Sequence, residues 1–202
     1  MKKLIWLLLT LGCGSVQAAG VVTAEDTWTD GNGHHYAVVR FSGITWQEAQ
    51  QDMASLLPDG YHLATVTSQA EQDFIVQLVN QSGYFSDYWL GGFQVAEPDM
   101  EPDGGWQWVT GEDWVYTSWR SGEPNNANGN ENYLTYDGPA GWNDCCTTVG
   151  NTVNGGYIAE VVPIPAAAYL FASGLGLLGW FSRKARKAKQ IVMDWSLPPD
   201  CL

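Results

Sequence analysis

The chain has 202 residues, of which 45% are hydrophobic and 13% aromatic, and its formal net charge is −13. This length suits one globular domain with short additions at its ends. Residues 19–162 carry 20 acidic residues against only Arg40 and Arg120, a net charge near −18. So negative a region repels polyanions, which excludes nucleic acid and anionic lipid as its partners.

The N-terminus has the pattern of a secretory signal. Lys2 and Lys3 precede the apolar run LIWLLLTLG, and SVQA then ends at Ala18. A basic start, an apolar centre and small residues before the cut are the order that signal peptidase requires. We therefore predict a signal peptide over residues 1–18, with an uncleaved N-terminal anchor as the alternative. Residues 19–32 are expected to be an N-terminal extension.

A strand and a helix are predicted next. HHYAVVRF, residues 34–41, has the composition of a strand, and TWQEAQQDMASLL, residues 45–57, has that of a helix. Thr45 with Glu48 forms a capping-box pattern at the helix start, and Pro-Asp-Gly ends the helix. Helical spacing predicts a buried face made of Trp46, Ala49, Met53 and Leu56.

A second strand and a second helix are predicted next. HLATV, residues 62–66, predicts a short strand, and SQAEQDFIVQLV, residues 68–79, predicts a second helix. Ser68 with Glu71 suggests a second capping box. The spacing places an apolar face on this helix, formed by Ala70, Phe74 and Leu78.

After Gly83 the chain changes to short aromatic strands separated by Gly, Pro, Asp and Asn. These strands are YWLGGF, GGWQWV, YLTY and GYIAEV, at residues 88–93, 104–109, 133–136 and 156–161. Two helices followed by a strand-rich second half with long loops indicate the α+β class. Aromatic residues at strand spacing usually pack inward, so we expect core positions for Trp89, Trp106, Trp108, Trp114 and Trp119.

Side-chain oxygens are concentrated in residues 123–144, EPNNANGNENYLTYDGPAGWND. The segment holds four carboxylates and six asparagines but no lysine, arginine or histidine. A solvated acidic face accounts for most carboxylates of the chain, but it does not explain this cluster. Calcium takes about six to eight oxygen ligands from carboxylates, amides and backbone carbonyls. The segment therefore predicts a calcium site.

The order of elements and four motifs resemble the C-type lectin-like domain over residues 33–161. The motifs are YWLGG at 88–92, HLATVTSQAEQDFI at 62–75, EPN at 123–125 and WND at 142–144. The resemblance implies a C-type lectin-like fold and a peptide bond before Pro124 that is cis. It also implies one calcium ion, whose ligands would be Glu123, Asn125, Glu131, Asn143 and Asp144.

Sugar binding is the activity that the resemblance implies. Two neighbouring hydroxyls complete the calcium shell, donating to carboxylates and accepting from asparagine NH₂ groups; this role falls on Glu123, Asn125, Glu131 and Asn143. Members with Glu-Pro-Asn favour mannose, glucose or N-acetylglucosamine. Trp142 is expected to be a core anchor that positions its neighbours. A second calcium site would need acids where this chain has Gln94 and Asn126, so one ion is predicted.

Two other functions are alternatives to the lectin. A protein-binding or structural module of the same fold is one, because a fold does not determine a function. A glycosidase with Glu123 and Glu131 as its acid pair is the other. It is disfavoured because a cation in a polar loop would hold both carboxylates ionised. We predict no enzymatic activity.

Cysteines and histidines offer little further chemistry. Cys145 and Cys146 are neighbours, so a bond between them restrains no long loop, and Leu56 or Leu57, Ala159 and Tyr133 stand where the resembled family has cysteines. A zinc site is not expected, because His34, His35 and His62 are distant in sequence from these two cysteines.

The C-terminal region has the pattern of a membrane segment. An apolar run from Ala166 to Phe181 is followed by Arg183, Lys184, Arg186, Lys187 and Lys189. This order favours a span near residues 164–182 with its basic end in the cytoplasm, and a buried core helix is the alternative.

Residues 162–190, with VPIPAAA before the run, resemble the bacterial sorting tail called PEP-CTERM. That resemblance implies processing by an exosortase and a place at the cell surface or in an exopolysaccharide matrix. Residues 191–202 depart from such tails and stay unassigned.

Overall fold

The computed structural model describes residues 19–84, 87–95, 100–146 and 152–163, and those up to Val162 form one compact unit. Two helices and a sheet confirm the α+β class. The predicted signal peptide and membrane segment lie outside the described residues. Within the described ranges, every helix is too short or too polar to cross a bilayer. In chain order the elements are β1 (Val21–Thr27), β2 (His35–Arg40), α1 (Trp46–Leu56), β3 (His62–Leu63), α2 (Gln69–Ser82), β4 (Tyr88–Gln94), β5 (Trp106–Trp108), η1 (Ala127–Gly129), β6 (Tyr133–Tyr136), η2 (Gly138–Ala140), β7 (Trp142–Cys145) and β8 (Gly156–Val161).

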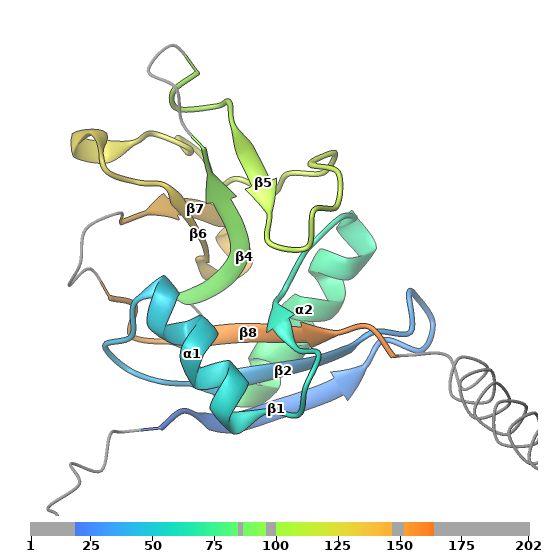
Figure 1. Ribbon diagram of the computed structural model, residues 1–202. Helices are drawn as coiled ribbons and strands as arrows, with labels where there is room; N and C mark the ends of the chain where they lie inside the picture. Colours follow the sequence, from blue (N-terminus) through green and yellow to red (C-terminus); the bar gives the residue numbers. More distant parts are fainter. Residues whose placement is uncertain (1–18, 85–86, 96–99, 147–151, 164–202) are drawn as a thin grey trace, which may run out of the picture. The chain divides into compact units, whose positions relative to one another are not determined.

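The strands form one sheet in the order β1-β2-β8-β4-β6-β7, with β3 on β8 and β5 on β4 (Figure 1). Among the named strands of the described residues, β4 and β8 pair in parallel and the other pairs are antiparallel. Strand β1 lies within the segment expected to be an extension, and it pairs with β2 from Val21–Arg40 to Thr27–His35. This strand, VVTAEDT, lies at the sheet edge and is largely exposed. Its sequence therefore lacks the alternation of apolar and polar residues that predicts a strand.

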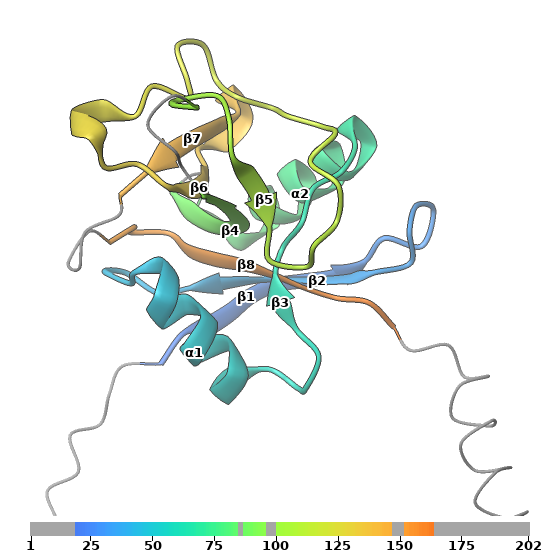
Figure 2. The ribbon, with the colours of Figure 1, turned by 45° about the horizontal axis from the view of Figure 1, so that its top comes forward.

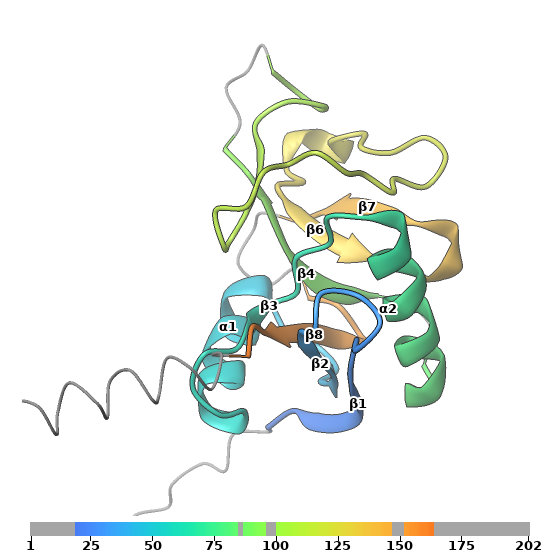
Figure 3. The same cartoon turned by 90° about the vertical axis from the view of Figure 1, so that its right-hand side faces the viewer.

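Helices α1 and α2 cover opposite faces of β2 and β8 (Figure 3). Along β2, Tyr36 and Val38 join the core on the α2 side, whereas Ala37 and Val39 join the core on the α1 side. Burial on both faces explains why this strand is apolar without alternation.

The buried helix faces agree only in part with the prediction. On α1, Trp46, Ala49 and Met53 are buried as expected. On α2 the buried apolar residues are Ile75, Leu78 and Val79, whereas Ala70 is exposed and Phe74 is half-buried. The predicted face of α2 is therefore confirmed for Leu78 and wrong for Ala70, because the buried side of the helix includes polar Glu71 and Gln72.

The two helix starts differ as well. Thr45 and Glu48 form the predicted capping box. At α2, Ser68 Oγ accepts from Glu71 N at 3.2 Å, but the Glu71 carboxylate accepts from Thr67 and Tyr36 instead of Ser68. The second capping box is thus incomplete, because the buried polar network described below takes this side chain.

Tryptophans form a platform beneath the loops. Trp89, Trp106 and Trp108 are buried as predicted. Trp114 and Trp119 are partly buried and pack against the cluster that contains Trp106, Trp108 and Trp142. Trp142 is fully buried, and its Nε1 donates to Gln72 Oε1 at 2.8 Å. The long connection from β5 to β6 lies on the β4–β7 side of the sheet, away from β1 (Figures 1 and 2).

Candidate functional site

A pairing outside the named strands brings the two halves of the site together. Trp142 N donates to Ser118 O at 2.6 Å, and Arg120 N donates to Trp142 O at 2.9 Å. The chain before Glu123 therefore runs beside β7, which carries Asn143 and Asp144. Residues about 20 positions apart become neighbours because buried Trp142 anchors this strand.

Asp144 ties the loop that begins at Pro124 to the sheet. The Glu123–Pro124 peptide bond is cis, as the resemblance implies. Beyond it, Asn125 N donates to both Asp144 carboxylate oxygens at 3.1 and 3.0 Å, and Asn126 N donates to Oδ2 at 2.7 Å. The carboxylate of Asp144, only 1% exposed, is held in place by main-chain donors.

The short turn at η1 brings Glu131 back to the loop that Asp144 holds. Its Oε2 accepts from Ala127 N at 2.7 Å, and its N donates to Asn126 Oδ1 at 3.2 Å. Burial raises the pKa of Glu131, and the nearby charges of Asp144 and Glu123 raise it further. Three predicted ligands therefore lie close enough to repel one another.

Glu123 has one carboxylate oxygen that the described residues leave without a partner. Its side chain is 5% exposed, and Oε1 accepts from Arg120 Nη2 at 2.9 Å and from Nε at 3.2 Å. Oε2 is buried and accepts no hydrogen bond from any described residue. Burial and neighbouring Asp144 raise the pKa of Glu123, and Arg120 opposes them. A buried orphan oxygen beside two more carboxylates fits a hard divalent cation.

The two predicted asparagines occupy different settings. Asn143 Oδ1 accepts from Arg120 Nη2 at 2.9 Å, and its Nδ2 donates to Asp144 O at 2.6 Å. The side chain of Asn125 is exposed, and only its main-chain N joins the network. All five predicted ligands thus belong to one connected loop site, with Asn125 at its open side.

Arg120 is the residue that sequence reasoning missed. It lies just before the acidic segment, which was taken to have no basic partner, and it pairs with Glu123 and, at 2.6 Å, with Asp137. That expectation was wrong for these two carboxylates. The spacing of three residues between Arg120 and Glu123 permits a pair across a turn, but no motif marks this pair in the sequence.

The metal-free structure adds a second argument against a glycosidase. A bound cation is expected to hold Glu123 and Glu131 ionised, and without one burial raises the pKa of both carboxylates. The two shifts have the same direction. An acid and base pair needs environments that push the two pKa values apart, so the geometry still does not favour hydrolysis.

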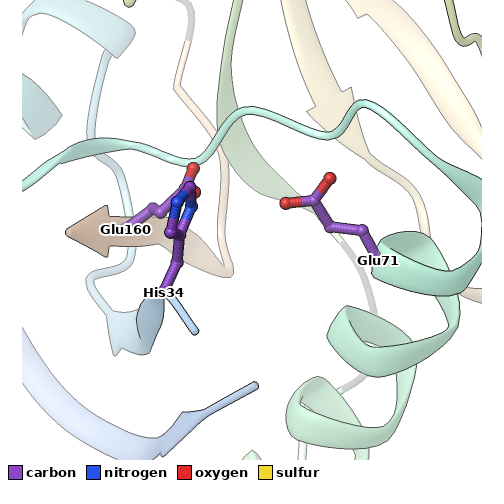
Figure 4. A group of neighbouring side chains, drawn as sticks. All are labelled: His34, Glu71 and Glu160. Atoms are coloured by element: carbon purple, nitrogen blue, oxygen red, sulfur yellow. The ribbon is translucent and has the colours of Figure 1, made fainter. Parts of the chain in front are cut away.

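A second group of metal-type donors lies between α2 and the sheet, formed by His34, Glu71 and Glu160 (Figure 4). Their ligand atoms lie within 4.8 Å of one another, although they are far apart in sequence. Tyr36 Oη donates to Glu71 Oε1 at 2.5 Å and to Glu160 Oε1 at 3.2 Å.

The remaining oxygens of this group are also satisfied. Thr67 N donates to Glu71 Oε2 at 2.7 Å, Thr65 N donates to Glu160 Oε2 at 2.9 Å, and His34 pairs with Glu160. Each carboxylate oxygen thus has a partner within the protein. The group is a buried network that ties α2 to β2 and β8.

Comparisons with known proteins agree with this architecture. The profile of the family described as "Lectin C-type domain" matches residues 42–153. Ladderlectin of Oncorhynchus mykiss is 33% identical over 123 residues, which are 59% of this chain and 60% of that protein. A lectin of Pleurodeles waltl is 35% identical over 107 residues, covering 50% and 56%. The chain thus spans about 60% or less of these curated relatives.

Solved structures show the same fold. The C-type lectin CEL-I from Cucumaria echinata is 22% identical with a TM-score of 0.52, and the match covers 64% of this chain and 90% of that one. The C-type lectin domain of murine dendritic cell inhibitory receptor 2, solved in complex with N-glycan, is 25% identical with a TM-score of 0.50, covering 64% and 91%. The chain belongs to the C-type lectin domain family, whose domains bind ligands and are not enzymes.

Proposed function

We propose that the chain binds carbohydrate through one calcium ion held in the loop from Glu123 to Asp144. The observation that carries this proposal is the buried Glu123 Oε2, which lacks a protein partner among the described residues and lies near two further carboxylates. When bound, calcium would supply a Lewis-acidic centre that accepts sugar hydroxyl oxygens. Its protein ligands would be Glu123, Asn125, Glu131, Asn143 and Asp144.

The protein's own residues would orient the sugar. Glu123, Asn125, Glu131 and Asn143 offer carboxylate acceptors and amide donors, the combination that a pair of neighbouring hydroxyls needs. Exposed Asn125 marks the open side of the site, where a ligand can approach. The Glu-Pro-Asn order favours mannose, glucose or N-acetylglucosamine, and the receptor domain solved with N-glycan supports a glycan ligand.

The proposal includes a location outside the cytoplasm. Export would follow from residues 1–18, and residues 162–190 would tether the domain until an exosortase removes them. The glycan would then be met at the cell surface or in an extracellular matrix. Fractionation of cells that express the full-length chain tests this, and protein found in the cytoplasm with Met1 retained contradicts it.

A glycan-binding screen with calcium and with chelator tests the function directly. We expect calcium affinity on the order of 10⁻⁴ to 10⁻³ M, so that chelator releases bound glycan readily. Asp144→Ala should abolish calcium and glycan binding, and Asp144→Asn, which keeps the side-chain shape, should do the same. Asp113→Ala, on an exposed loop away from the site, is the matched control and should bind as the parent does.

Two results would remove the proposal. Absence of calcium uptake at about 10 mM, far above the expected dissociation constant, would contradict the metal site. Calcium uptake with no glycan bound by any condition of the screen would favour the protein-binding module instead.

A further inference from the structure

The Arg120 guanidinium lies among the oxygens that calcium would use. Nη2 lies 2.9 Å from Glu123 Oε1 and 2.9 Å from Asn143 Oδ1, and Nη1 lies 2.6 Å from Asp137 Oδ2. Two of these three acceptors belong to the proposed ligand set. Asp137 does not.

The backbone at Arg120 is held by main-chain hydrogen bonds, whereas its side chain is partly exposed. Arg120 N donates to Trp142 O at 2.9 Å, and Arg120 O accepts from Glu123 N at 3.1 Å. The side chain is 39% exposed, and Asp137, its outer partner, is 32% exposed. The guanidinium can therefore leave the inner oxygens for the outer one without a main-chain change.

Within the described part of the chain, the other basic residue is engaged elsewhere. Residues 19–163 contain only Arg40 and Arg120, and Arg40 lies over the Tyr84 ring at 3.8 Å. Without a cation, Glu123 would be a buried carboxylate lacking any compensating charge, which is unfavourable. Arg120 supplies that charge in the metal-free domain.

We propose that Arg120 is an internal counter-ion that competes with calcium for Glu123 and Asn143, and that calcium binding displaces it toward Asp137. This inference rests on the proposed calcium site. The guanidinium contacts the side chains of Glu123 and Asn143, which the metal would also contact, and two cations held by the same side chains repel each other. Arg120 thereby keeps the loop assembled without metal and weakens calcium affinity, so that the ion is readily exchanged.

Removal of the charge tests the competition. Calorimetric calcium titration of the purified full-length protein should give a dissociation constant about three- to tenfold lower for Arg120→Gln than for the parent. Arg40→Gln makes the same change in net charge away from the site and should leave the constant unchanged. In chelator, Arg120→Gln should melt at a lower temperature, because buried Glu123 then lacks its cation.

A second variant follows the displaced side chain. Asp137→Asn removes the outer partner, so it should weaken calcium binding in the parent background. In the Arg120→Gln background the same change should have a smaller effect, since no guanidinium is left to be received. If Arg120→Gln folds poorly, Arg120→Lys replaces it as the test variant. Arg120→Lys keeps the positive charge, so its calcium affinity should stay near that of the parent and should still fall when Asp137→Asn is added.

The outcomes separate this inference from the proposed function. Calcium binding that is unchanged or weaker in Arg120→Gln overturns the competition and leaves the calcium site intact. Tighter calcium binding by Arg120→Gln than by the parent, with the Arg40→Gln constant unchanged, supports it. No uptake by any variant overturns both.

Discussion

At the scale of single residues, the site is a set of carboxylates that the fold forces together. Asp144 is held by main-chain donors, Glu131 by the η1 turn, and Glu123 by Arg120. Each is partly or fully removed from water, and burial raises the pKa of Glu123 and Glu131. Such an arrangement is unfavourable without a cation and becomes favourable with one.

Glu123→Gln is the sharpest single change at this scale. It removes one charge and leaves the volume, so we expect calcium affinity to fall at least about tenfold, as expected for the loss of a charged ligand. The stability of the metal-free protein should change little, because two effects offset each other. The substitution removes the ion pair with Arg120, but it also removes a buried charge whose second oxygen has no partner. Calcium titration and thermal melting in chelator measure the two effects. Glu112→Gln, on an exposed loop, is the control, and an equal loss of affinity there would refute the assignment.

The bond between Cys145 and Cys146 lies directly after Asp144 in the chain. Because it joins neighbouring residues, its removal frees no loop in the unfolded chain. We predict that reducing agent shifts the melting temperature of the full-length protein by no more than a degree or two, on the order of the experimental spread. A fall of many degrees would show that these sulfurs bridge something else.

Motifs in the sequence predict the five proposed ligands, whereas Arg120 was missed for a physical reason. The motifs Glu-Pro-Asn and Trp-Asn-Asp identify their residues from the sequence alone, whereas Arg120 belongs to no motif. Its role depends on the pairing of residues 118–120 with Trp142, and that contact is visible only in three dimensions.

At the scale of elements, the parts with strong local signals were predictable and the sheet edge was not. Capping and spacing at Thr45 located α1, and the apolar run at Tyr36–Val39 located β2. Strand β1 forms by pairing with β2. The burial of polar residues on α2 depends on Tyr36, which bonds both Glu71 and Glu160. Local patterns do not report such partners.

The starts of α1 and α2 allow a local capping interaction to be compared with a buried network of residues distant in sequence. Thr45→Ala removes an exposed capping box and should lower the free energy of unfolding by about 1 kcal/mol. Glu71→Gln should cost more, about 2 kcal/mol, because it leaves donors of Tyr36 and Thr67 poorly matched in a buried network. Urea unfolding in chelator compares them. Equal effects would mean that the network around Glu71 adds nothing beyond capping.

At the scale of the whole molecule, buried acidic groups make stability depend on pH. Residues 19–162 carry a net charge near −18, and burial raises the pKa of Glu160 as well as those of Glu123 and Glu131. A raised carboxyl pKa means that the folded state favours the protonated form. The corresponding stability is complete below the ordinary value of 4.5 and is lost as pH rises through the folded value.

We therefore predict that the metal-free protein is more stable near pH 5 than near pH 7.5. The pKa of exposed Glu48, lowered by its bond from Thr45 N, works in the opposite direction but is a single group. Urea unfolding in chelator at about these two pH values measures the slope. Glu160→Gln should flatten it, and a stability that rises toward pH 7.5 in chelator would contradict the account.

The central claim is that calcium in the Glu123–Asp144 loop carries glycan binding, and one measurement tests it most directly. Purified full-length protein is applied to immobilised mannose in calcium and then washed with chelator, beside Asp144→Asn as the metal-site variant. We predict retention of the parent in calcium, its release by chelator and no retention of the variant. Parent protein that stays bound after chelation, or a variant that binds equally well, would contradict the claim.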